Sequence, residues 1–181
     1  MKSKLFCSLL ILLSHCASAQ EFLFPVDEKT KKITYQDVIE VDSVSKDEIY
    51  DCIMIWIKIH FKTDKEIIDF VSKDAGKIFL TPTTKLYAKK DGRTYYVGYW
   101  KYLINISVYD FKYKYVISEF VETNTSEKFS SIGNLENDDG NTSIYSFPNK
   151  QQMMQMKRNL HEEVTAMIRS LKRNVSKELT D

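Results

Sequence analysis

Apolar and polar residues alternate along much of the chain beyond residue 32, which is the pattern of half-buried β-strands. The alternating segments, which are also rich in β-branched and aromatic side chains, are residues 33–41, 67–72, 77–88, 94–109 and 112–122. Short connections join the last four segments, so the pattern predicts an antiparallel sheet of about five strands. Pro82 in the third segment indicates an edge or a bulge, because proline cannot donate a ladder hydrogen bond.

Two other segments place apolar residues three or four positions apart, as amphipathic helices do. The first follows the capping box Ser45-Lys46-Asp47-Glu48, and the second begins at Asn149. Their apolar stripes are Ile49, Cys52, Ile53, Trp56, Ile57 and His60 in the first helix, and Met153, Met156, Leu160, Val164, Met167, Ile168, Leu171 and Val175 in the second. The order β-α-β-β-β-β-α therefore predicts an α+β two-layer sandwich with two helices on one face of the sheet.

The segment 94–109 has two unlike faces if its side chains alternate strictly. The face that we expect to meet the helices holds Tyr96, Trp100, Tyr102, Ile104, Ile106 and Val108. The opposite face mixes aromatic and polar side chains, and its candidate binding residues are Tyr95, Val97, Tyr99 and Leu103. Exposed aromatic patches often mark interaction sites, so we predict that a ligand or partner docks there. The alternative is that residues 20–32 or 123–147 cover this face.

Residues 1–19 have the pattern of an export signal. A lysine-containing start precedes an apolar run over residues 5–13, and small residues lead up to Ala19. We predict cleavage between Ala19 and Gln20 and an exported protein, periplasmic or secreted. Cys16 follows a histidine rather than a small residue, so we do not expect a lipid anchor there. No later apolar run approaches the roughly 20 residues of a membrane-spanning helix, so none is expected in the mature chain.

The remaining chain fits one domain with two appended segments. Residues 20–32 are a lead-in, and residues 33–122 form the α+β core. Residues 123–147 are a polar, acidic loop, and residues 148–181 form the C-terminal amphipathic helix, which we expect to pack on the core.

Net charge argues against nucleic acid as a partner. The whole chain has 26 basic and 25 acidic residues. Cleavage after Ala19 removes Lys2 and Lys4, so acidic residues then slightly exceed basic ones. A nucleic-acid-binding domain normally has a clear basic excess. Cleavage also removes Cys7 and Cys16, which leaves Cys52 with no cysteine to form an intramolecular disulfide.

No familiar catalytic or metal-binding spacing occurs in the mature chain. We expect His60 to lie at the boundary of its apolar stripe, His161 on a solvated helix face, and Cys52 in the core. Residues 137–141 resemble part of a calcium loop, but Leu135 and Ser146 stand where an EF-hand needs an acid and a glutamate. We therefore predict no catalytic residue, metal or cofactor. Asp42-Ser43-Val44 resembles the O-glycosylation signal of Bacteroidetes, which makes Ser43 a candidate modification site.

Five short motifs occur together in one order: Phe24-Pro25-Val26-Asp27, Ile33-Thr34-Tyr35, Val44-Ser45-Lys46-Asp47-Glu48, Ala75-Gly76-Lys77-Ile78 and Lys112-Tyr113-Lys114-Tyr115. They resemble a family of secreted Bacteroidetes proteins, the domain of unknown function numbered 4468. The resemblance covers about residues 33–122 and implies a TATA-box-binding-protein-like fold, with a curved antiparallel sheet and helices on one side. The family tends to have Asp-Gly where this chain has Asp110-Phe111. Positive φ is costly at phenylalanine, so we expect a wider turn here.

Three classes of function remain open at this stage. The favoured class is a non-catalytic extracytoplasmic module that binds an envelope protein or a small ligand, because the aromatic face is the one positive signal. The alternatives are an enzyme whose active site is assembled from dispersed residues and a structural subunit of an envelope complex.

Overall fold

The computed structural model describes residues 24–62, 67–125, 129, 131–137 and 147–178. These residues form six strands and two helices, which are β1 (Tyr35–Glu40), α2 (Lys46–His60), β2 (Ile68–Ser72), β3 (Lys77–Leu80), β4 (Thr83–Lys90), β5 (Arg93–Tyr109), β6 (Lys112–Asn124) and α3 (Lys150–Glu178). The predicted α+β class and element order are confirmed. The count of about five strands becomes six because the segment 77–88 divides at Thr81-Pro82 into β3 and β4.

All neighbouring strands of the sheet are antiparallel, in the order β1-β6-β5-β3-β2. The 17-residue β5 has two partners on the same side. Its first part pairs with β4, and its later part pairs with β3. The hairpin partner β6 lies along the opposite side of β5 over most of its length.

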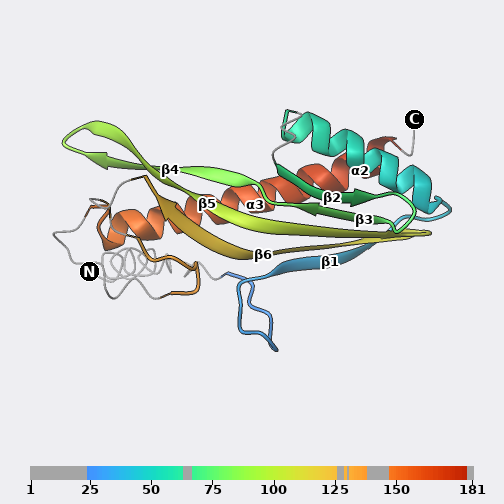
Figure 1. Cartoon of the computed structure of the whole chain (residues 1–181), viewed down its shortest axis with the longest axis horizontal. Helices are drawn as coiled ribbons and strands as arrows, with labels where there is room; N and C mark the ends of the chain where they lie inside the picture. The colour runs from blue at the N-terminus through green and yellow to red at the C-terminus, as the bar shows by residue number, and fades with distance from the viewer. Residues whose placement is uncertain (1–23, 63–66, 126–128, 130, 138–146, 179–181) are drawn as a thin grey trace, which may run out of the picture.

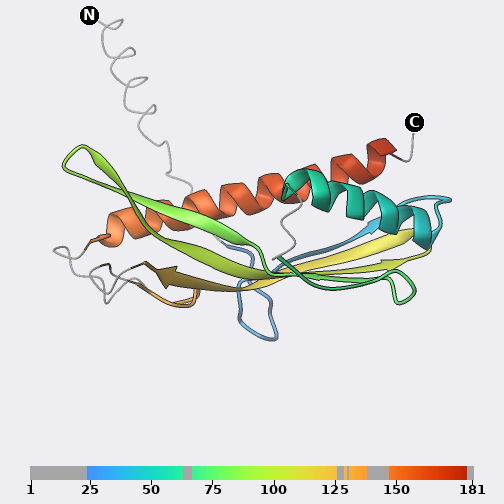
Figure 2. The same cartoon turned by 45° about the horizontal axis from the view of Figure 1, so that its top comes forward.

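Both helices lie on the same side of the sheet (Figures 1 and 2). α3 runs along the length of the sheet, and α2 lies beside its C-terminal part (Figure 2). Most of the apolar stripe predicted for α3 is buried, namely Met153, Met156, Leu160, Val164, Met167, Leu171 and Val175, and Ile168 is partly buried against the core. The described residues place no helix on the other side of the sheet, so the core is a single layer between the sheet and the helices. No described helix is long and apolar enough to cross a membrane.

Reciprocal caps begin both helices. At α2, the backbone N–H of Glu48 donates to Ser45 Oγ at 3.4 Å, and the Ser45 N–H donates to Glu48 Oε2 at 3.0 Å. At α3, the N–H of Gln152 donates to Asn149 Oδ1 at 3.0 Å, and the Asn149 N–H donates to Gln152 Oε1 at 2.9 Å. Each cap satisfies N–H groups that the helix itself leaves without partners, which confirms the two predicted starts.

The turn between β5 and β6 differs from the expectation. Tyr109 pairs directly with Lys112, so the turn has only two central residues, and Phe111 has a φ of 65°. The expected wider turn is therefore wrong. The Phe111 N–H donates to Val44 O at 3.0 Å, and the Val41 N–H donates to Phe111 O at 2.8 Å. These bonds to the β1–α2 connection hold a conformation that phenylalanine alone disfavours.

Candidate binding face

A bulge in β5 changes the side-chain pattern that strict alternation predicts. Leu86 of β4 pairs with Gly98, but the next residue, Tyr87, pairs with Tyr96, so Val97 is an extra residue in β5. A one-residue bulge reverses the alternation on its far side. Side chains that precede Gly98 therefore lie on the opposite faces from those predicted.

The bulge corrects the faces that were predicted for two of the four candidate binding residues. Tyr95 pairs with the buried Ala88 on the helix side, and its ring lies 5.7 Å from that of Phe147, which precedes α3. Val97 is completely buried. Tyr96, which strict alternation assigns to the core, lies on the other face with 41% of its surface exposed. Of the four predicted residues, Tyr99 and Leu103 keep their assigned face, and Tyr95 and Val97 do not.

The sequence contains one signal of the bulge. A Cβ added at Gly98 would lie 2.1 Å from the carbonyl oxygen of Thr123 in β6, so the two backbones approach too closely for any other residue. A glycine inside a strand pattern is typical of such a bulge or close approach. The neighbouring residues do not reveal the bulge, because tyrosines fall on both faces of the strand whether the alternation is strict or interrupted at Gly98.

We call the side of the sheet that lies away from α2 and α3 the open face. Residues paired in register share a face, so its apolar and aromatic members can be assigned from the pairing. They are Val38, Phe70, Phe79, Tyr87, Tyr96, Tyr99, Leu103, Tyr109, Val116 and Val121. Leu103 is 44% exposed and Phe70 is 49% exposed. Two ring pairs bridge neighbouring strands, with centroids 5.7 Å apart in Tyr87–Tyr96 and 5.8 Å apart in Phe70–Phe79.

A shallow cleft of about 430 Å³ hollows one part of the open face. It lies where β3 ends and β4 begins, beside the start of β2. Its lining residues are Ile67, Asp69, Thr81, Thr83, Tyr96, Tyr99 and Lys101. Thr81 Oγ1 donates a hydrogen bond to Asp69 Oδ2. Phenol, hydroxyl, carboxylate and ammonium groups thus surround one space, which suits hydrogen bonding to a polar group of a ligand.

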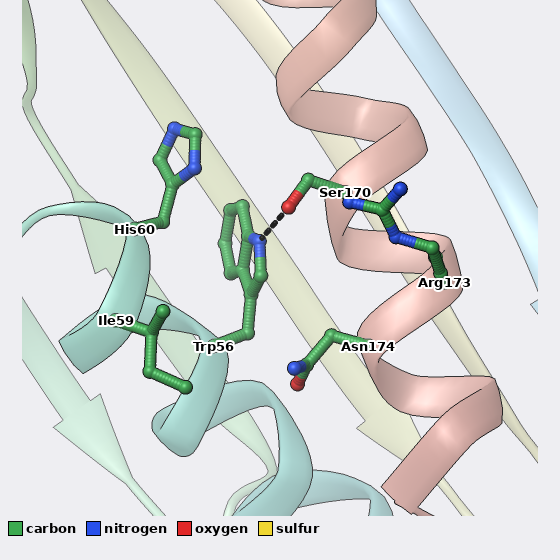
Figure 3. Close-up of a pocket in the computed structure, with 6 residues that line it drawn as sticks. All are labelled: Trp56, Ile59, His60, Ser170, Arg173 and Asn174. Carbon is green, nitrogen blue, oxygen red and sulfur yellow. Dashed lines mark hydrogen bonds between the residues drawn. The ribbon is translucent and has the colours of Figure 1, made fainter.

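A smaller pocket of about 210 Å³ lies on the helix side, between α2 and α3. Its residues are Trp56, Ile59, His60, Ser170, Arg173 and Asn174 (Figure 3). The Trp56 indole N–H donates to Ser170 Oγ at 3.3 Å and so joins the two helices (Figure 3). His60 stacks on Trp56 with ring centroids 5.2 Å apart, and burial lowers the pKa of this imidazole. His60 thus lies at the stripe boundary, as predicted.

His161 is partly buried rather than fully solvated, which corrects that expectation. The Tyr35 hydroxyl oxygen is 2.8 Å from His161 Nδ1, and the Phe24 ring lies 5.9 Å from the imidazole. Burial lowers the pKa of His161, partly offset by the charge of Glu162, and burial raises the pKa of Tyr35. The contact with Tyr35 joins β1 to α3, over a sequence separation that no local pattern can reveal.

The other predicted chemical groups are not brought together. Cys52 is buried on α2, as predicted. Within the described ranges, no group of three histidine, cysteine or acidic side chains is placed to hold a metal ion. Ser43 is exposed in a turn, so its hydroxyl is accessible to a modifying enzyme. Cys16, Ala19 and Gln20 lie outside the described residues.

Comparison with known proteins identifies a related fold. Residues 35–123 match the sequence model of the family described as "Domain of unknown function (DUF4468) with TBP-like fold". A solved TBP-like protein from Parabacteroides distasonis ATCC 8503 is similar with a TM-score of 0.52 and 20% identity, over 82% of this chain and 96% of that one. A solved DUF4468 family protein from Bacteroides ovatus ATCC 8483 has a TM-score of 0.59 and 14% identity, over 83% and 90% of the two chains. None of the curated proteins matches this chain in sequence.

These likenesses concern the fold, because the identities to the two solved structures are low and a shared fold does not carry a function. The family match covers β1, α2 and the strands through nearly the whole of β6, which is the part of the chain that builds the open face. From β1 to β6 the chain thus matches a family of unknown function, and it shares the TBP-like fold of the two solved proteins.

Proposed function

We propose that this protein is a non-catalytic, extracytoplasmic binding module and that the open face is its docking surface for another protein. The export pattern of residues 1–19 supports the location. One observation carries the docking surface: the open face exposes aromatic and aliphatic side chains on several adjacent strands, whereas both helices cover the other face. Exposed apolar and aromatic side chains gathered on one face are typical of an interaction site.

Tyrosines suit such a surface because they offer a large contact area with few rotatable bonds, and their hydroxyls keep the unoccupied surface wettable. Tyr87, Tyr96 and Tyr99 lie close together on β4 and β5. The cleft beside Tyr96 and Tyr99 adds hydrogen-bonding groups at the border of this patch. An apolar centre with polar groups around it is the usual composition of a protein interface.

Photo-crosslinking in the native host tests the proposal. A benzophenone amino acid would replace Leu103 on the open face in one strain and Met154 on α3 in another. The two positions are matched, since Leu103 is 44% exposed and Met154 is 47% exposed. We expect a discrete crosslinked product from position 103 and none from position 154. Equal products from both positions, or none from position 103, would contradict the proposal.

A further inference from the structure

Lysine side chains surround the apolar part of the open face. The register places six of them on this side of the sheet: Lys77, Lys85, Lys89, Lys101, Lys112 and Lys114. The described carboxylates on or beside the same face include Glu40, which is opposite Lys112, Asp69 in the cleft, Asp27, which accepts a hydrogen bond from Gln36 at 3.4 Å, and Glu119 at a bulge of β6. Glu119 is itself paired with Lys32 at 2.7 Å, so the face has a clear excess of positive charge.

These six lysines form no ion pair with any carboxylate in the described part of the chain. Lys77 Nζ instead donates to Ser107 Oγ at 2.6 Å. Two lysines on the helix side do form ion pairs, since Lys73 pairs with Asp51 at 2.7 Å and Lys172 pairs with Asp37 at 2.8 Å. The positive charge of the open face is therefore not neutralised within the described protein and is available to a partner.

The lysines form two groups with an apolar centre between them. Lys85, Lys89 and Lys101 lie toward the β4–β5 end, whereas Lys77, Lys112 and Lys114 lie toward the β5–β6 turn. Leu103 and the row that contains Phe79 and Val116 lie between the groups. Ser107 of β5 pairs with both Lys77 and Lys114, and it lies six residues after Lys101. At a rise of about 3.3 Å per residue, the two lysine groups are therefore roughly 20 Å apart along β5.

We propose that the partner on the open face is an acidic protein segment, with apolar side chains at its centre and carboxylates on both sides. This inference rests on the proposed function and adds the chemistry of the partner. Two separated positive groups around an apolar centre match such a segment in both charge and pattern. Nucleic acid or an anionic lipid surface would engage the lysines but would leave Leu103, Phe79 and Val116 without an apolar partner. The nearly neutral whole chain also gives little long-range attraction for a polyanion.

A model peptide tests the charge and the apolar centre separately. The probe has a central phenylalanine-leucine segment flanked by glutamates, and its counterpart has glutamine at every glutamate. Fluorescence anisotropy would measure binding of each to the purified, signal-free protein. We expect the acidic peptide to bind roughly tenfold more tightly or better, and this advantage to shrink as salt is raised. Equal affinity for both peptides, including no binding of either, would overturn the inference.

A matched pair of variants locates the binding. Lys101→Gln with Lys114→Gln removes one lysine from each group, whereas Lys58→Gln with Lys150→Gln removes two exposed lysines from the helices and changes the net charge equally. We expect the first pair to abolish most of the preference for the acidic peptide and the second to preserve it. Thermal melts confirm that both variants are folded. Equal losses in both variants would overturn the inference.

Two further outcomes separate the inference from the proposed function. Tighter binding of duplex DNA or phosphatidylglycerol vesicles than of the acidic peptide would overturn an acidic protein partner in favour of a polyanion. If the crosslink from position 103 persists in the Lys101→Gln, Lys114→Gln variant and the peptides bind equally, the charge inference fails while the docking surface remains. If position 103 gives no crosslink, the proposed function itself fails.

Discussion

The covered and open sides of β5 differ in burial rather than in side-chain type. Trp100 and Ile106 on the covered side are completely buried, whereas Tyr96 and Leu103 on the open side keep about two fifths of their surface exposed. One strand thus contributes large apolar groups to the core and, at alternate positions, to the solvent-facing sheet. The apolar content of a strand therefore does not tell which of its residues are buried in the core and which are exposed. Only the phase of the alternation does.

The largest effect that we expect is a difference in stability between a substitution on the covered side of β5 and one on the open side. Trp100→Ala should lower the free energy of unfolding by roughly 3–5 kcal/mol, because it leaves a large cavity between β5 and the helices. Leu103→Ala should cost less than about 1 kcal/mol, since half-exposed side chains lose little packing. Urea denaturation of both variants measures the difference. Similar losses would mean that the open face is buried in the folded protein.

The next effect concerns the bulge that sets the phase. Gly98→Ala should destabilise the protein by about 1–3 kcal/mol or more, because the new methyl group meets the backbone of Thr123 and the strands must separate. Gly92→Ala is the control, since nothing lies within 4 Å of a Cβ added there, although its φ of 73° still strains alanine. A Gly98→Ala variant no less stable than Gly92→Ala would argue against the close contact between β5 and β6.

A third prediction uses binding to distinguish the two neighbouring tyrosines. Tyr96→Ser should weaken the crosslinked product formed from position 103 several-fold, because it removes an aromatic contact from the open face. Tyr95→Ser should leave the product nearly unchanged, since the Tyr95 ring lies against Phe147 on the helix side. Quantitative blotting of the product compares the strains. The opposite ranking would restore the strict alternation that the bulge replaces.

The smallest effect lies on the covered side and depends on pH. Burial lowers the pKa of His161 in the folded protein below the value of 6.5 that is usual for histidine. As the pH falls below 6.5, the unfolded chain therefore takes up a proton more readily, and the folded state loses stability. His161→Gln should show a shallower loss over this range than the unmodified protein. Thermal melts at a series of pH values provide the measurement, and an unchanged slope would contradict a role for His161.

Local patterns predict the parts of this fold that local interactions determine. The capping boxes at Ser45 and Asn149 depend on residues three positions apart, so both helix starts could be recognised from the sequence. Pro82 indicated an irregularity between residues 77 and 88, but the sequence did not show that this segment divides into the two strands β3 and β4. Features that depend on distant segments were missed, since the phase of β5 is set by β4 and β6, and the burial of His161 requires Tyr35 from β1.

The tight β5–β6 turn has a consequence for the order of assembly. The strands of this hairpin are separated by a turn of two residues, whereas most of the core sequence separates β1 from its partner β6. Contacts between near neighbours in sequence close with the smallest loss of chain entropy. The β4–β5 hairpin has an equally short turn, since Lys90 pairs with Arg93, so the local contacts of both hairpins can form before β1 joins β6. Phe111 can bond to Val41 and Val44 only after the β1–α2 connection has packed beside the turn. In a hairpin that forms earlier, its unfavourable positive φ has no compensation from these bonds.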